Sequence, residues 1–158
     1  MALSDGDRRL QAIEDHIAIE KLIYRYAHCI DRGDADGVAA LFAPDGRFRT
    51  RIMNEARELG PDAYDITGHE ALTAFAKMVF QRIITPPSVA QANVLTNAVI
   101  EVDGDTANAS TYFTLIKATA TGREIAGYGR YLDIIVRCPD GQWRFKDRRS
   151  EVETPNPG

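Results

Sequence analysis

Apolar side chains in residues 17–30 recur at the three- and four-residue spacing of an amphipathic helix. The stripe comprises Ile19, Leu22, Ile23, Tyr26, Ala27 and Ile30. Arg32-Gly33 predicts the end of this helix, because glycine favours the conformation that closes a helix. Asp34 is suited to cap a second, short helix that continues through residues 41–42.

The middle of the chain alternates between turn, strand, loop and helix signals. The Pro-Asp-Gly sequence at 44–46 predicts a turn, and residues 47–52 alternate polar and apolar side chains like a half-buried strand. Residues 54–65 are polar and contain Gly-Pro, which predicts a surface loop. A further helix is expected to begin at Thr67-Gly68-His69-Glu70 and to stop before the two prolines at 86–87. Its apolar face is formed by Leu72, Phe75, Ala76 and Val79.

The second half of the chain has the alternation of β-strands. Four long strands are predicted at 89–102, 107–120, 124–137 and 143–152, with turn sequences between them. Consecutive strands joined by tight turns form an antiparallel meander, so the fold class is α+β. We expect a cone-shaped α+β barrel, with the N-terminal helices packed in a curved antiparallel sheet. The open mouth of such a cone can hold an apolar pocket for a small molecule.

Composition limits the classes of function. The chain has 158 residues, of which 44% are hydrophobic, and this suits a single globular domain over residues 1–153 with a disordered tail at 154–158. The net charge of −4 argues against nucleic-acid binding, and no segment has the length of a membrane span. The two cysteines lack metal-ligand spacing, so free thiols and a cytoplasmic location are expected, with no metal.

The first candidate chemistry is the pair of Tyr26 and Asp31 on the long helix. We expect a phenol and a carboxylate that both point toward the core. Burying polar groups costs free energy unless they are paired, and proton-transfer sites are built from such groups.

Three sequence patterns carry a resemblance to a known family. They are YAHCIDRGD at 26–34 followed by LFAPDG at 41–46, LTNAVIEVDGDTA at 95–107, and GYGRYLD at 127–133 with WRFKDRR at 143–149. With these patterns the chain resembles the SnoaL-like family of the nuclear-transport-factor-2-like superfamily. Its resemblance extends to scytalone dehydratase, bile-acid 7α-dehydratase and hexachlorocyclohexane dehydrochlorinase, which work without metal or organic cofactor.

The resemblance implies a set of site residues. Asp31 matches the aspartate that orients the catalytic histidine of these enzymes, and Tyr26 matches a functional position on the same helix. Arg148, Phe113 and Leu115 match positions that line the pocket of the dehydrochlorinase. The histidine itself is replaced, because its position corresponds to Asn93, and an amide cannot act as a base at neutral pH.

Each polar candidate also has a structural interpretation. Asp31 could cap the helix or pair with Arg32 or Arg148, or it could be a catalytic acid or base. Tyr26 could be core packing, or it could bind a substrate oxygen or protonate a leaving group. Asn93 could satisfy backbone groups at a strand end, or it could hold a substrate carbonyl or hydroxyl.

A second group lies on the last two strands. Tyr131 and Asp133 share one strand face by their spacing, and the resemblance directs that face toward the pocket. Asp133 could be a second buried carboxylate with an acid or base role, or it could form a salt bridge to Arg148. Arg148 could be that partner, or it could clamp an anionic oxygen of the substrate, which Tyr131 would also hold.

Two classes of function follow. The first is a cofactor-independent lyase of the dehydratase type, or a related isomerase, acting on a small apolar cyclic or aromatic compound as a homodimer or homotrimer. The second is a non-catalytic protein: the small (beta-type) subunit of an aromatic-ring hydroxylating dioxygenase, or a ligand-binding protein. Neither class is expected to bind a membrane.

Overall fold

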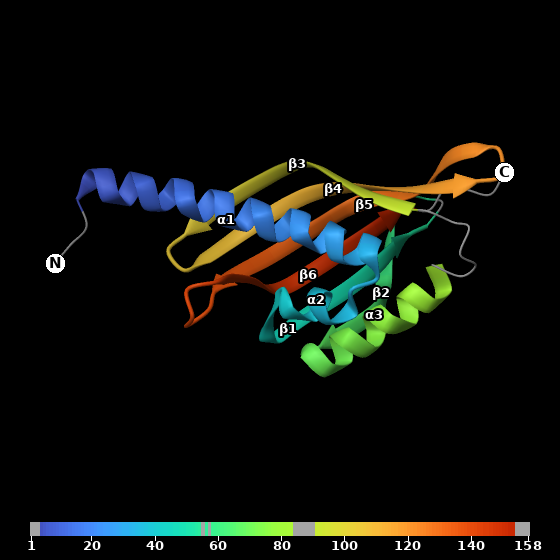
Figure 1. Ribbon diagram of the computed structural model, residues 1–158, viewed down its shortest axis with the longest axis horizontal. Helices are drawn as coiled ribbons and strands as arrows, with labels where there is room; N and C mark the ends of the chain where they lie inside the picture. The colour runs from blue at the N-terminus through green and yellow to red at the C-terminus, as the bar shows by residue number, and fades with distance from the viewer. Residues whose placement is uncertain (1–3, 55, 57, 84–90, 154–158) are drawn as a thin grey trace.

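The computed structural model describes residues 4–54, 56, 58–83 and 91–153. Six strands form one curved sheet that does not close on itself, and three helices pack along its inner face (Figure 1). This arrangement confirms the predicted α+β class with N-terminal helices held by a curved sheet. The predicted helix stop at 86–87 and the predicted disordered tail at 154–158 lie outside the described residues.

The long helix α1, Asp5–Arg32, crosses the inner face of the sheet, and its first turns extend beyond the sheet edge (Figure 1). Ser4 and Asp7 form a capping box at its start, and Gly33 closes it in the left-handed conformation at φ 67°. Its predicted stripe is confirmed, since Ile19, Leu22, Ile23, Tyr26 and Ala27 are buried. Helix α2, Ala35–Ala40, is shorter than predicted and is capped by the Asp34 side chain.

The first two strands correct the sequence analysis. Strand β1, Phe42–Met53, contains the segment 44–46 that was predicted to be a turn. A Cβ on Gly46 would lie 2.8 Å from the Ala43 and Phe145 carbonyl oxygens, so the glycine serves close approach inside a strand. Strand β2, Leu59–Thr67, replaces most of the predicted loop. It is an edge strand, where Pro61 is tolerated because one backbone side needs no partner.

The rest of the chain follows the prediction closely. Helix α3 spans His69–Ile83, followed by β3 (Gln91–Asp103), β4 (Thr106–Thr119), β5 (Gly122–Arg137) and β6 (Trp143–Glu153). The sheet order is β2-β1-β6-β5-β4-β3. Pairs along β3 to β6 are antiparallel, as expected of a meander, whereas β1 joins β6 in parallel. The four-strand meander therefore forms one wall of the cone, and β1 and β2 extend it beneath α3.

Candidate functional site

The helices and the sheet enclose a cavity of about 290 Å³ that we call the inner cavity. Its wall is mainly apolar, with contributions from all three helices and from β1 to β6. The predicted apolar face of α3 forms one side, and Phe113 and Leu115 of β4 form part of another, as the sequence analysis expected. A mainly apolar cavity of this size suits a small ring compound.

Two tyrosines supply hydroxyl groups to this cavity. Tyr26 of α1 and Tyr131 of β5 are both buried, line the cavity, and meet edge to face with ring centroids 5.6 Å apart. The two phenols lie close enough for each to influence the pKa of the other. Burial raises the pKa of both phenols, so both keep their protons at neutral pH and can donate hydrogen bonds.

Asp31 does not point into the core, and that part of the prediction is wrong. Five residues along a helix correspond to a rotation of about 140°, which places Asp31 on a different face from Tyr26. The Asp31 side chain is exposed, and its Oδ1 accepts hydrogen bonds from the Asn93 backbone N–H at 3.0 Å and from Asn93 Nδ2 at 2.8 Å. Asn93 also lines the inner cavity, so the two predicted residues do meet beside it.

The carboxylate of Asp31 is linked electrostatically to the tyrosine wall. Its negative charge contributes to the raised pKa of Tyr131. The residues that the structure describes provide no hydrogen-bond donor to Oδ2 of Asp31, which leaves that oxygen open to a ligand or to solvent. An amide and two phenols therefore line the apolar cavity, and a carboxylate is hydrogen-bonded to that amide.

Arg148 and Asp133 form a buried ion pair next to the tyrosines. Arg148 Nε lies 3.5 Å from Asp133 Oδ1, and both side chains are fully buried. The Arg148 guanidinium also lies 4.1 Å from the ring centroid of Tyr26, 3.9 Å from that of Tyr131 and 4.3 Å from that of Phe145. The salt bridge is one of the two interpretations that the sequence left open. Arg148 thus faces the cavity through the tyrosine rings.

This pair is poorly satisfied. Among the described residues, both oxygens of Asp133 and all three guanidinium nitrogens of Arg148 lack a hydrogen-bond partner. Desolvation raises the pKa of Asp133 to about 6, although the Arg148 charge opposes that shift. Buried charges without hydrogen bonds are expensive, so the pair is not explained by its contribution to stability.

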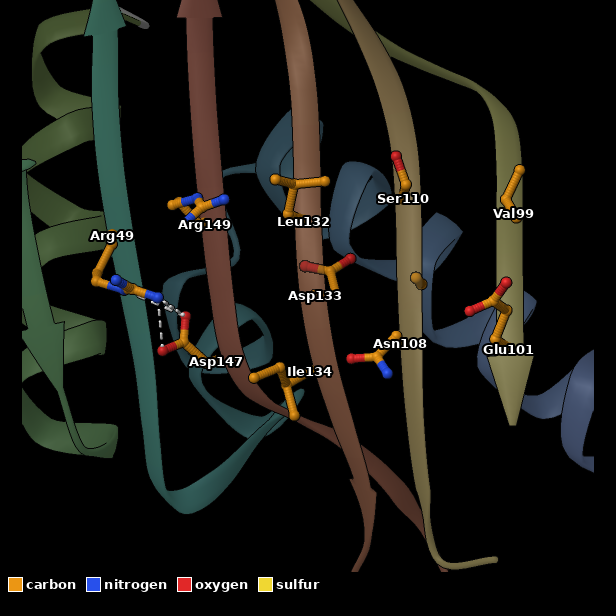
Figure 2. A pocket seen from close by; sticks show the side chains of 11 residues that line it. Arg49, Val99, Glu101, Asn108, Ser110, Leu132, Asp133, Ile134, Asp147 and Arg149 are labelled. Carbon is orange, nitrogen blue, oxygen red and sulfur yellow. Dashed lines mark hydrogen bonds and ion pairs between the residues drawn. The ribbon is translucent and has the colours of Figure 1, made fainter. Parts of the chain in front are cut away.

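A second hollow, of about 420 Å³, lies on the opposite face of the sheet and is called the outer hollow here (Figure 2). Its wall mixes charged, amide and aliphatic side chains from β1 and β3 to β6, and its lining residues include Asp133. Arg49 donates three hydrogen bonds to Asp147 across this surface, one from Nε at 3.3 Å and two from Nη2 at 2.9 and 3.0 Å (Figure 2). Charged side chains line the outer hollow, whereas none of the described residues that line the inner cavity is charged.

Two further arginines and a histidine have structural partners. Arg47 and Arg51 of β1 pair with Asp65 and Asp62 of β2, at 2.5 and 2.8 Å. With the Arg49–Asp147 pair, they make the outer face of β1 a row of ion pairs. At the start of α3, His69 Nε2 lies 2.8 Å from the Phe42 carbonyl oxygen.

The sequence analysis missed three polar residues of the cavity wall. Thr50, Tyr64 and Ser150 line the inner cavity from β1, β2 and β6. Tyr64 was missed because residues 54–65 were predicted to be a loop. The alternation of Tyr64 with Ile66 is the sequence signal that could have identified this segment as a strand. Asp15 was also missed; it is buried and accepts hydrogen bonds from Trp143 and Arg137, which anchor α1 to the sheet.

Sequence comparison agrees with this architecture. The sequence model of the SnoaL-like domain matches residues 11–149. This range contains every residue that lines the inner cavity except Ser150 and Val152 of β6. The chain belongs to the SnoaL-like domain family. No curated protein sequence matches this member of the family. Among the described helices, none combines the length and hydrophobicity needed to cross a bilayer.

Solved structures show the same fold. A variant of Rv3472 from Mycobacterium tuberculosis, a protein of unknown function, is 30% identical, with 96% of this chain and 78% of that chain covered at a TM-score of 0.73. An NTF2-like protein with a cystatin-like fold from Novosphingobium aromaticivorans is 23% identical, with 99% and 92% covered at a TM-score of 0.79. The beta subunit of a proposed aromatic-ring-hydroxylating dioxygenase from that organism is 19% identical, with 92% and 93% covered at 0.73.

Proposed function

We propose that this SnoaL-like protein is a cofactor-independent lyase of the dehydratase type, or a closely related isomerase. The substrate is a small, largely apolar cyclic or aromatic compound that occupies the inner cavity. One observation carries this proposal: an apolar cavity of about 290 Å³ has two phenols and the Asn93 amide in its wall, and the Asp31 carboxylate accepts a hydrogen bond from that amide. Apolar walls hold the ring, and the clustered polar groups define where its oxygen lies.

Each polar group has a role in this proposal. Tyr26 and Asn93 donate hydrogen bonds to the substrate oxygen that gains negative charge, and Tyr131 orients Tyr26 through the edge-to-face contact of their rings. Asp31 removes a proton from the neighbouring carbon, directly or through a water that it orients. The carbon–carbon double bond forms as the hydroxyl group leaves, and the proton taken by Asp31 is returned to it, so that water departs. A donor already in place can contribute about 3 kcal/mol to such a transition state.

The test uses a panel of cyclic β-hydroxy ketones and phenolic alcohols, with the loss of one water followed by mass spectrometry. Asp31→Asn is expected to abolish turnover, because an amide cannot take the proton, and Tyr26→Phe to reduce it by roughly a hundredfold. Asp36→Asn, an exposed carboxylate of α2, is the matched control and should leave the rate unchanged. Turnover that survives Asp31→Asn would remove the assigned base. Saturable binding with no turnover at any pH would identify a ligand-binding protein instead.

The alternative class, a subunit that assembles with another chain, is favoured by a separate observation. Leu10, Ile13 and Ile17 lie at helical spacing on α1 and are 55%, 57% and 43% exposed. A stripe of exposed apolar side chains is typical of a surface that contacts another protein. The mass of the purified chain in solution distinguishes the cases, since a homodimer or homotrimer agrees with the enzyme proposal and dependence on a larger co-purifying chain agrees with the subunit.

A further inference from the structure

The Arg148 guanidinium is enclosed by the rings of Tyr26, Tyr131 and Phe145, and two of these rings belong to the wall of the inner cavity. The side chain itself is fully buried, so a ligand in the cavity meets the phenols first and the cation behind them. Asp133 is the counter-charge, with its Oδ1 3.5 Å from Arg148 Nε. It lies on β5, directly opposite Arg148 on β6.

We infer that Arg148 is a positioning residue that gives the phenol wall of the inner cavity a preference for oxyanions. The ligand would then be a phenolate, or a carbonyl compound whose oxygen becomes an enolate oxygen during the reaction. This inference rests on the proposed function, because it assigns the chemical class of the group that the two phenols hold.

The buried, mainly apolar surroundings of Arg148 give the site a low effective dielectric. A charge acts over several ångströms in a buried, apolar environment, and a cation in contact with a phenol ring favours negative charge at its hydroxyl. The Arg148 charge lowers the pKa of both Tyr26 and Tyr131, against the larger effect of burial. The same field acts on a ligand oxygen that accepts a hydrogen bond from these hydroxyls.

Two negative charges oppose this field. Asp133 pairs with Arg148 directly, and Asp31 lies close enough to contribute to the raised pKa of Tyr131. Arg148 and Asp133 should therefore act on the ligand in opposite directions. A purely structural pair behaves differently, since removing either partner would loosen the same packing and weaken every ligand alike. The sign of the two effects separates the two interpretations.

The experiment uses para-nitrophenol, whose absorption spectrum distinguishes phenol from phenolate, at a fixed pH where both forms are present in solution. The neutral para-nitrotoluene, of nearly the same shape, reports the integrity of the cavity. Wild type is compared with Arg148→Met and with Asp133→Asn, and thermal unfolding confirms that each variant is folded.

We expect wild type to bind para-nitrophenol as the phenolate. Arg148→Met should weaken phenolate binding by about tenfold, and Asp133→Asn should strengthen it by a similar factor, because each removes one charge of opposite sign. Binding of para-nitrotoluene should change much less in both variants. If Arg148→Met does not fold, Asp133→Asn decides alone, since a structural role predicts weaker binding.

Two other results are informative. If both variants bind the phenolate more weakly than wild type, both bind it more tightly, or neither changes, the inference is overturned. The proposed function would then still stand. Failure of wild type to bind either probe would instead contradict the proposed function, and the inference would fall with it.

Discussion

The two faces of the sheet use the same residue types in opposite ways. On the outer face, Arg49 is partly exposed and makes three hydrogen bonds to Asp147. On the inner face, Arg148 is fully buried, approaches Asp133 no closer than 3.5 Å, and makes no side-chain hydrogen bond to the residues that the structure describes. An exposed pair contributes little to stability and is screened by salt, whereas a buried pair can cost more in desolvation than its attraction returns.

The buried pair of Arg148 and Asp133 is the part of the molecule that stability alone does not explain. Ion pairs such as Arg49–Asp147 are common on the solvent-facing side of a strand and need no functional explanation. The inner pair keeps two charges next to the cavity-lining phenols, and their desolvation offsets their attraction, so that apolar side chains of similar volume would keep the fold about as stable. Polar groups that are retained at such a cost are candidates for function.

The largest effect is expected from breaking the inner pair. Arg148→Met leaves Asp133 buried without its counter-charge, and the free energy of unfolding should fall by about 4 kcal/mol. The double variant Arg148→Met/Asp133→Leu removes both charges and should recover most of that loss. Urea unfolding at pH 7 measures both. A single variant as stable as wild type would mean that the inner pair is not the buried ion pair described above.

The second prediction concerns pH. Asp133 has a pKa raised from 3.8 to about 6 by burial, so the folded state holds its proton more tightly than the unfolded state. The wild type should therefore lose stability relative to Asp133→Asn as pH rises from about 4 to about 6, by about 2–3 kcal/mol. Urea titrations of both proteins across this range supply the difference. A difference that grows in the opposite direction would show that the attraction to Arg148 outweighs desolvation.

The smallest effect belongs to the outer face. Arg49→Met makes the same substitution as Arg148→Met, but the carboxylate that it leaves, Asp147, remains partly accessible to water. We expect the free energy of unfolding to fall by less than about 1 kcal/mol, and the difference to shrink at high salt. An effect as large as that of Arg148→Met would erase the contrast between the two faces.

The sequence pattern was sufficient for elements whose partners are close along the chain. Helical spacing identified the buried stripe of α1, and alternation with turn sequences identified the strands from β3 to β6 within about two residues. It failed at β1 and β2. There, Gly46 and Pro61 resemble turn and loop residues, and their roles depend on the parallel pairing of β1 with β6 and on the edge position of β2.

The site was predicted in its composition more than in its geometry. Tyr26, Tyr131, Asn93, Phe113 and Leu115 all line the inner cavity. The pairing of Asp133 with Arg148 depends on a register shift between Ile134 and Ile135 of β5; without it, Asp133 would lie opposite Asp147. Such an irregularity arises from packing across the whole sheet, so local alternation could not reveal it.

The most direct test of the account is a crystal structure of the protein soaked with para-nitrophenol. The account predicts a ring inside the inner cavity, with its phenol oxygen within hydrogen-bonding distance of the Tyr26 or Tyr131 hydroxyl and Asp31 beside it. A compound bound only in the outer hollow, or an inner cavity that stays inaccessible at saturating ligand, would contradict the claim that the inner cavity is the functional site.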